Sequence, residues 1–320
     1  MKEEINGIIY CLDEENLTAE LIRMIWRDSE GEITIPETIM FNGVSYRVTS
    51  IEDRAFSGCS LLTSVTIPDS IKSIGMYVFQ LCSSLTSITI PNGVKSIERG
   101  AFSECSSLTT IVIPDSVTSI GKNAFVECES LKAITIPDSV TSIGDWAFAG
   151  CKSLTSIIVP KRVTSIGRNV FVRCSSLTSI VVARGNTKYD SREKCNAIIE
   201  TRNNSLMYGC QTSIIPNGVT SIGYRAFAGC SSLTSITIPD SVGIIEEGAF
   251  EYCKKLTSVT IPNSVSIIES GAFAHCSSLN SITFQGTIAQ WKNIESYCYR
   301  NLFTTFPFKV VHCTDGDVEI

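Results

Sequence analysis

The sequence predicts a repeat solenoid, with a parallel β-sheet on one face and short turn, 3-10 or helical segments on the other. Three features repeat together every 23 residues: a phenylalanine, an alternating apolar segment that ends in proline, and a closing cysteine. The phenylalanines are Phe56, Phe79, Phe102, Phe125, Phe148 and Phe171, and then Phe227, Phe250 and Phe273. A fixed period of this length is typical of arrays in which each unit buries its apolar face only against its neighbours.

One repeat shows how each element is expected to form. Leu85–Pro91 alternates apolar with Ser and Thr residues, which predicts a strand with one buried face. Pro91 lacks an N–H and ends the pairing. Val94–Ile97 predicts a second short extended piece, and Ala101–Cys105 predicts a single helical or 3-10 turn that buries Phe102. The same strand end recurs at Ile35, Ile67, Ile90, Ile113, Ile136, Val159, Val182, Ile215, Ile238, Ile261 and Phe284.

The repeat carries the pattern CxxLxxIxIPxxVxxIGxxAFxxC, intact in Cys105–Cys128 and Cys128–Cys151. In this pattern the chain resembles the leucine-rich repeats of the BspA-like family, over roughly Val48–Phe284. The resemblance implies a right-handed solenoid that binds proteins, host matrix proteins or partner cells among them. It also implies a cell-surface or secreted location, and it supplies no catalytic residue.

Breaks in the period divide the chain into five parts. They are an N-terminal β-hairpin cap (1–47), leucine-rich repeats (48–182), an island with a β-hairpin (183–214), further repeats (215–284) and a C-terminal cap (285–320). In the first cap, Gly7–Leu12 and Ala19–Met24 bracket an acidic turn, and Asn42-Gly43 predicts a second hairpin. Such caps cover the open apolar ends of a solenoid.

The island lies where two phenylalanines are 56 residues apart, two periods plus ten. Asn196–Glu200 and Leu206–Cys210 flank the polar segment Thr201–Ser205, which predicts a hairpin that projects from the solenoid. It could be a binding protrusion, or a structural patch that keeps the stack continuous.

At the C-terminal end, Gly286–Ile294 has the spacing of a short amphipathic helix, and Lys309–Cys313 predicts a last strand. We interpret Trp291 as part of the cap rather than as a ligand-stacking residue. Asp315–Asp317 offers too few oxygens for calcium and is expected to be an exposed tail.

Nine of the 14 cysteines occupy one repeat position. They predict a ladder of buried, reduced thiols, because nine equivalent sites cannot all pair and zinc-site spacing is absent. His275 occupies a variable repeat position. His312 and Cys313 are adjacent in a predicted strand and so point to opposite faces, which is a poor arrangement for a catalytic dyad.

Composition limits the function classes. The net charge is −6, and the cationic residues form no stripe, so we expect no nucleic-acid partner. No apolar run reaches the length of a bilayer span. The N-terminus carries acids where a secretory signal has its apolar stretch, so the protein stays inside, had its signal removed, or leaves by another route.

The expected function is a non-enzymatic protein–protein interaction scaffold, an adhesin or cell-surface recognition protein. Outward strand positions are uniform rows of Ser and Thr, interrupted by Val112, Ile158 and Val181. The positions around the Ala-Phe pair vary far more, and exposed Tyr, Trp and Arg are enriched in the energetic centres of interfaces. The candidate protein-binding residues are Tyr77, Trp146, Arg168, Tyr224, Arg225 and Tyr252.

Two alternatives remain open. One is an enzyme with its site at the 183–210 island, around Tyr189, Asp190, Arg192 and Glu200. The other is a passive spacer or self-assembling repeat. We assign no catalytic, cofactor-binding or metal-binding residue, because no nucleotide-binding, hydrolase or metalloprotease motif occurs.

Overall fold

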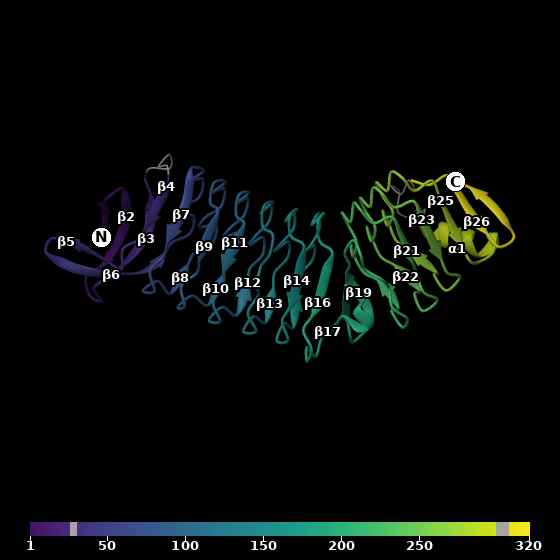
Figure 1. The fold of residues 1–320 in the computed structure, drawn as a ribbon, viewed down its shortest axis with the longest axis horizontal. Coiled ribbons are helices and arrows are strands. Elements are labelled where there is room, and N and C mark those ends of the chain that lie inside the picture. Colours follow the sequence, from purple (N-terminus) through teal and green to yellow (C-terminus); the bar gives the residue numbers. More distant parts are fainter. Residues whose placement is uncertain (26–30, 299–306) are drawn as a thin grey trace. The chain divides into compact units, whose positions relative to one another are not determined.

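The computed structural model describes residues 1–25, 31–298 and 307–320 (Figure 1). The chain forms two compact units. Unit 1 contains Met1–Leu154 and Arg162–Phe171, and unit 2 contains Thr155–Lys161 and Val172–Ile320. Each unit is a stack of 23-residue rungs, so the predicted repeat solenoid is confirmed. The five-part division of the chain stays a prediction.

The rungs of unit 1 form two parallel ladders. The alternating segments form the sheet β11-β9-β7-β4, with identical repeat positions paired, such as Ile111 with Ile88. The predicted second extended piece is a two-residue Ser-Ile strand in each rung. The strands are β4 (Gly31–Thr34), β7 (Leu62–Thr66), β9 (Ser87–Thr89), β11 (Thr110–Val112), and then β8 (Ser73–Ile74), β10 (Ser96–Ile97), β12 (Ser119–Ile120), β13 (Ser142–Ile143) and β15 (Ser165–Ile166).

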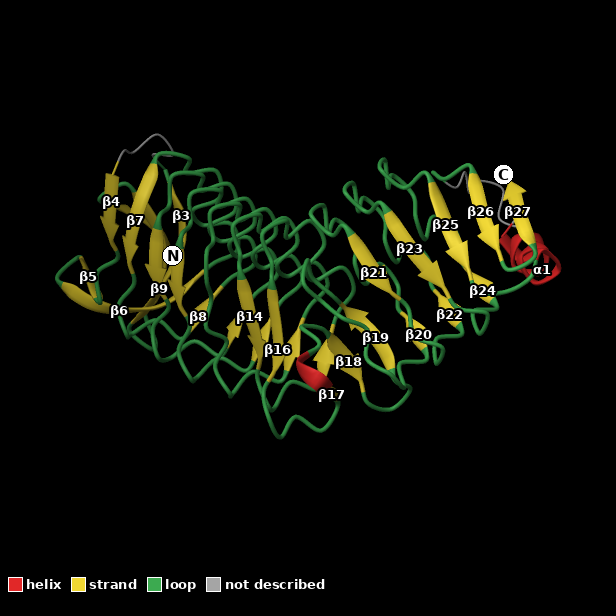
Figure 2. Cartoon of the chain, turned by 45° about the vertical axis from the view of Figure 1, so that its right-hand side comes forward, coloured by secondary structure: helices red, strands yellow, loops and turns green. Residues whose placement is uncertain are grey.

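Unit 2 repeats this arrangement (Figure 2). Its alternating segments are β14 (Ser156–Val159), β16 (Ser179–Val182), β21 (Ser235–Thr237), β23 (Ser258–Ile261) and β25 (Ser281–Phe284). Its second ladder contains β20 (Ser221–Ile222), β22 (Ile244–Ile245) and β24 (Ile267–Ile268). The expected strands that end at Ile136 and Ile215 are not formed, although both isoleucines are buried.

The Ala-Phe segments are tight turns, and no repeat has a helix within the described ranges. In this segment two residues, four positions apart, have a positive φ, for example Tyr77 at 55° and Leu81 at 61°. Three N–H groups of the turn point at the next rung, as Tyr77, Phe79 and Leu81 donate to the carbonyls of residues 99, 101 and 103. The turn face is therefore a third ladder of hydrogen bonds.

The core is a column of stacked rings and thiols. The rings of Phe102 and Phe125 lie 5.4 Å apart and nearly parallel, and the same stacking occurs in unit 2. In six rungs the cysteine thiol donates to the phenylalanine carbonyl one rung earlier, as Cys128 Sγ does to Phe102 O at 3.1 Å. Burial raises the pKa of the Cys105 thiol to about 12 and that of Cys128 well above its ordinary value. The thiols therefore stay protonated and act as small buried donors.

The N-terminal segment is a sheet of strand order β1-β2-β3-β6-β5, in which β6 also pairs with the repeat strand β8. Both predicted hairpins are present, as the antiparallel pairs β2–β3 and β5–β6. A third hairpin, β1–β2 around Asn6-Gly7, was not predicted. The strands are β1 (Lys2–Ile5), β2 (Ile8–Asp13), β3 (Thr18–Met24), β5 (Thr38–Phe41) and β6 (Val44–Ile51).

The island hairpin forms, but it does not project as expected. β18 (Ile198–Glu200) and β19 (Ser205–Tyr208) pair antiparallel, and β19 then pairs in parallel with the repeat strand β20. Ile199 and Leu206 are fully buried in the core of unit 2. β17 (Tyr189–Asp190) completes the sheet at its edge, and η1 (Arg192–Lys194) is a 3-10 turn beside it. The island is thus a modified rung, because its apolar side chains are buried in the same core as those of the repeats.

The C-terminal segment packs a helix, α1 (Ile288–Cys298), beside β25 and the hairpin of β26 (Val310–Cys313) and β27 (Gly316–Glu319). Trp291 is fully buried, with its ring 5.5 Å from that of Phe284, which fits a cap and leaves no face for a ligand. Asp315–Asp317 is exposed, as expected, but it lies in the β26–β27 hairpin rather than in a tail. Asp315 Oδ1 accepts a hydrogen bond of 2.7 Å from the N–H of Ile288, at the start of α1.

Candidate protein-binding surface

Four of the six candidate residues coincide with the strained positions of the turns. Tyr77, Trp146 and Arg225 have φ of 55°, 58° and 52° at the position before the Ala-Phe pair, and Tyr252 has φ of 61° at the second such position. Other rungs place residues there that tolerate this conformation: Gly100, Asn123, Asn169, Gly248 and Gly271. A bulky residue in the left-handed region costs about 1–2 kcal/mol, so something must offset it.

At Tyr77 the compensation is packing within the protein. The guanidinium groups of Arg54 and Arg99 lie over its ring, 5.2 and 5.6 Å from the centroid. The ring also covers Gly100, where an added Cβ would overlap it. Tyr77 is therefore half-buried by its neighbours rather than free for a partner.

The candidates of unit 2 are also engaged. Arg225 forms an ion pair of 3.2 Å with Glu251, and its guanidinium lies 5.5 Å from the centroid of the Tyr224 ring. Tyr252 stacks on His275 of the next rung at 4.3 Å. These contacts explain the aromatic residues without a partner, because each covers a neighbouring turn.

Trp146 and Arg168 are brought together in unit 1. They lie on adjacent rungs, joined by a hydrogen bond from Trp146 N to Arg168 O of 2.9 Å. Arg168 is exposed, and its N–H is fixed by Asp145 Oδ1 at 2.8 Å. Tyr77 lies three rungs away in the same column, with Gly100 and Asn123 between.

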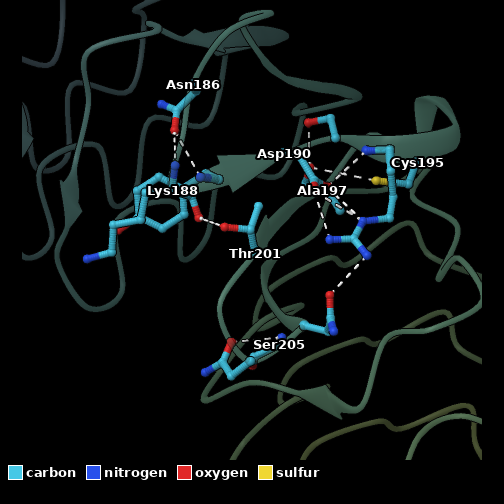
Figure 3. A network of polar contacts seen from close by, with 12 residues as sticks. Asn186, Lys188, Asp190, Cys195, Ala197, Thr201 and Ser205 are labelled. Atoms are coloured by element: carbon cyan, nitrogen blue, oxygen red, sulfur yellow. Dashed lines mark hydrogen bonds and ion pairs between the residues drawn. The ribbon is translucent and has the colours of Figure 1, made fainter.

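The island residues of the enzymatic alternative make contacts within the protein (Figure 3). Arg192 holds Asp190 through two nitrogens, at 2.9 and 2.7 Å, and this pairing raises the pKa of the guanidinium. Arg192 also donates to Asn204 across the hairpin. Glu200 lies 3.9 Å from Lys188, and Tyr189 is buried. These contacts join β17, η1 and the β18–β19 hairpin of the island.

The strand face of unit 2 contains a patch that sequence reasoning found only in part. Ile158 and Val181 pair directly across β14 and β16 and are 59% and 40% exposed. Ile214, on the next rung, is 54% exposed. The sequence did not reveal it, because Thr212–Ile215 has one residue fewer than the equivalent Thr178–Val182, which shifts the register. The hydroxyl of Thr212 donates to Thr178 O and aligns that rung beside β16.

A hollow of about 550 Å³ begins at Ile214 and continues along the same face. Its floor includes Ile236 and Ile238, and its rim carries Asn217 and Asp240. Within the described ranges, no group of three or more His, Cys, Asp or Glu side chains could hold a metal ion. In the same ranges, no helix is long and apolar enough to cross a bilayer.

Comparison with known proteins supports the repeat pattern. A family model described as the BspA type leucine rich repeat region matches residues 39–125, 96–205 and 199–309. A leucine rich cell surface protein of Faecalibacterium prausnitzii is 30% identical, with a TM-score of 0.57, over 92% of this chain and 97% of that one. No curated protein matches the chain.

Two further solved structures share the fold. The pneumococcal vaccine antigen PcpA is 23% identical, with a TM-score of 0.66, over 90% of this chain and 82% of that one. A leucine-rich repeat protein of Eubacterium ventriosum is 19% identical, with a TM-score of 0.53, over 88% of this chain and 71% of that one.

Proposed function

Since the chain belongs to the family of BspA-type leucine-rich repeat proteins, we propose that it is a non-enzymatic scaffold that binds other proteins, as an adhesin or recognition protein at a cell surface. The observation that carries the proposal is that buried structural positions and variable outward positions are separate within each rung. Phenylalanine, cysteine and the turn backbone are committed to internal ladders, while the outward positions vary on a fixed frame. A preorganised surface loses little conformational entropy on binding.

The similar F. prausnitzii protein is described as a cell surface protein, which supports the location. On the turn face, we propose Trp146 and Arg168 as the contact residues of unit 1, because Arg168 is exposed beside the ring-bearing position. Tyr77, Tyr224, Arg225 and Tyr252 support neighbouring turns and contribute their outer edges.

The test is capture of partners from matrix and cell-surface extracts, identified by mass spectrometry. The variant Trp146→Ala/Arg168→Ala should lose the partner that the natural protein retains. The matched control is Lys122→Ala/Asn123→Ala, since Asn123 is the counterpart of Trp146 one rung earlier and Lys122 precedes it. If both variants retain the partner, the turn face is not the contact. If the natural protein retains none, protein binding itself fails, and light scattering then tests self-assembly.

A further inference from the structure

The exposed patch on the strand face of unit 2 departs from the repeat in two ways at once. Outward strand positions hold threonine in most rungs, and three residues further, in the turn, stands Asp or Asn. That turn row reads Asp69, Asn92, Asp115, Asp138, Lys161, Arg184, Asn217, Asp240 and Asn263. The two cations follow Ile158 and Val181 respectively, so the gain of an aliphatic side chain and the reversal of charge occur on the same two rungs.

The structure places these changes side by side. β14 and β16 pair in register, with Ile158 opposite Val181 (Figure 2). The turns that follow are joined as well, since Asn186 Nδ2 donates to Pro160 O at 2.9 Å and Ala183 N donates to Val159 O at 2.8 Å. Lys161 and Arg184 are exposed at the carboxyl ends of these two strands. An aliphatic strip thus has a cationic edge in a protein whose net charge is −6.

Unit 1 offers an internal comparison. Val112 is 58% exposed in the same outward row, but the turn residue that follows it is Asp115. A lone β-branched residue with an ordinary turn is what strand propensity alone would supply. The patch of Ile158, Val181 and Ile214 is instead three rungs wide, carries its own charge and continues into the hollow.

From this combination we infer that the patch docks a peptide segment of a partner protein that carries aliphatic side chains flanked by Asp or Glu. The aliphatic side chains lie over Ile158, Val181 and Ile214, and the acidic residues face Lys161 and Arg184. The segment continues into the hollow toward Asp240, where a neutral or basic residue fits. Burial of the aliphatic groups supplies affinity, and the cationic edge supplies orientation and association rate. This inference rests on the proposed protein-binding function and specifies its partner's chemistry.

The experiment is selection of a random dodecapeptide phage library on the natural protein, followed by fluorescence anisotropy with the synthesised consensus peptide. We expect the selected peptides to combine aliphatic with acidic residues. Ile158→Thr/Val181→Thr and Lys161→Asn/Arg184→Asn should each weaken binding about tenfold or more. All four changes restore residues that other rungs hold at these positions, so the fold is kept, which circular dichroism verifies.

Three controls separate the outcomes. Val112→Thr should leave the affinity unchanged. Raising the salt concentration should weaken binding of the natural protein more than that of Lys161→Asn/Arg184→Asn, because that variant lacks the charges. A consensus peptide with its acidic residues changed to lysine should not bind.

Selected peptides without acidic residues would overturn the inference, as would equal binding by the patch variants or no enrichment at all. None of these results touches the proposed protein-binding function, which fails only if whole-protein capture yields no partner.

Discussion

Residues in the turn columns and in the outward strand row both vary from rung to rung. Variable turn residues such as Tyr77 are covered by neighbouring side chains, whereas variable strand residues such as Ile158 are exposed. On the turn face, Tyr77 lies between Arg54 and Arg99, and Tyr252 stacks on His275. On the strand face, Ile158 and Val181 are 59% and 40% exposed. Variation in a repeat thus supports a proposed binding position only where the side chain is not already covered by the adjoining rung.

The largest effect should come from the frame that both faces share. Phe125→Ala removes a fully buried ring that stacks on Phe102 and Phe148, and should lower the free energy of unfolding by about 3–5 kcal/mol. Guanidinium unfolding followed by circular dichroism measures it, with Val112→Ala on the strand row as the control. A loss below about 1 kcal/mol would mean that the stack is not the source of rung stability.

The thiol column should make the frame sensitive to alkaline pH. Burial raises the pKa of Cys105 to about 12 in the folded state, against an ordinary value of 9.0. The stabilisation is therefore complete below about pH 9 and is lost as the pH rises toward 12, by about 1.4 kcal/mol per pH unit for each thiol. Unfolding in reducing buffer from pH 8 to 10.5 should show this decline.

The matched variant for this prediction is Cys105→Ala, which should reduce the slope by one thiol's share. An unchanged slope would show that lysine and tyrosine residues, rather than the thiols, carry the alkaline loss. Cys128→Ala gives the same test one rung later, and each variant also loses one thiol hydrogen bond, to Phe79 O for Cys105 and to Phe102 O for Cys128.

How far the sequence leads differs between frame and surface. The period located most of the strands, the Phe column and the Cys column. Buried positions recur every 23 residues whatever the local backbone conformation is. The period did not distinguish a helical turn from the actual ladder, since Ala101, Phe102 and Cys105 fit both. The positive φ was visible only where Gly or Asn stands at one of the two positions, as at Gly100, Asn123 and Gly150. Ile214 was not predicted, because its rung lacks one residue of the strand segment. The island was expected to project, because a hairpin pattern does not show which of its faces is buried in the core.

A glycine pair tests whether turn residues are held by their neighbours. Gly100 and Gly271 have nearly equal φ, 61° and 65°, in the same column. A Cβ on Gly100 would overlap the Tyr77 ring, whereas on Gly271 it would meet only Ala274 Cβ at 3.7 Å. We expect Gly271→Ala to cost about 1 kcal/mol and Gly100→Ala about 1 kcal/mol more. In a Tyr77→Ala background the difference should vanish; if it persists, the ring does not rest on Gly100.

The smallest effect on stability should occur at the strand row, where the comparison predicts the largest effect on binding. Val181→Thr replaces an exposed side chain with the residue that other rungs carry there, so the free energy of unfolding should change by less than about 0.5 kcal/mol. The same substitution at Val112 is the stability control. If Val181→Thr destabilises unit 2 clearly more than Val112→Thr does unit 1, then Val181 belongs to the packing between rungs, and the contrast between the faces fails. Equal, near-zero changes would mean that nothing in the fold requires an aliphatic residue at Val181, because threonine stabilises the strand equally well. Only a partner that binds this face would then distinguish valine from threonine.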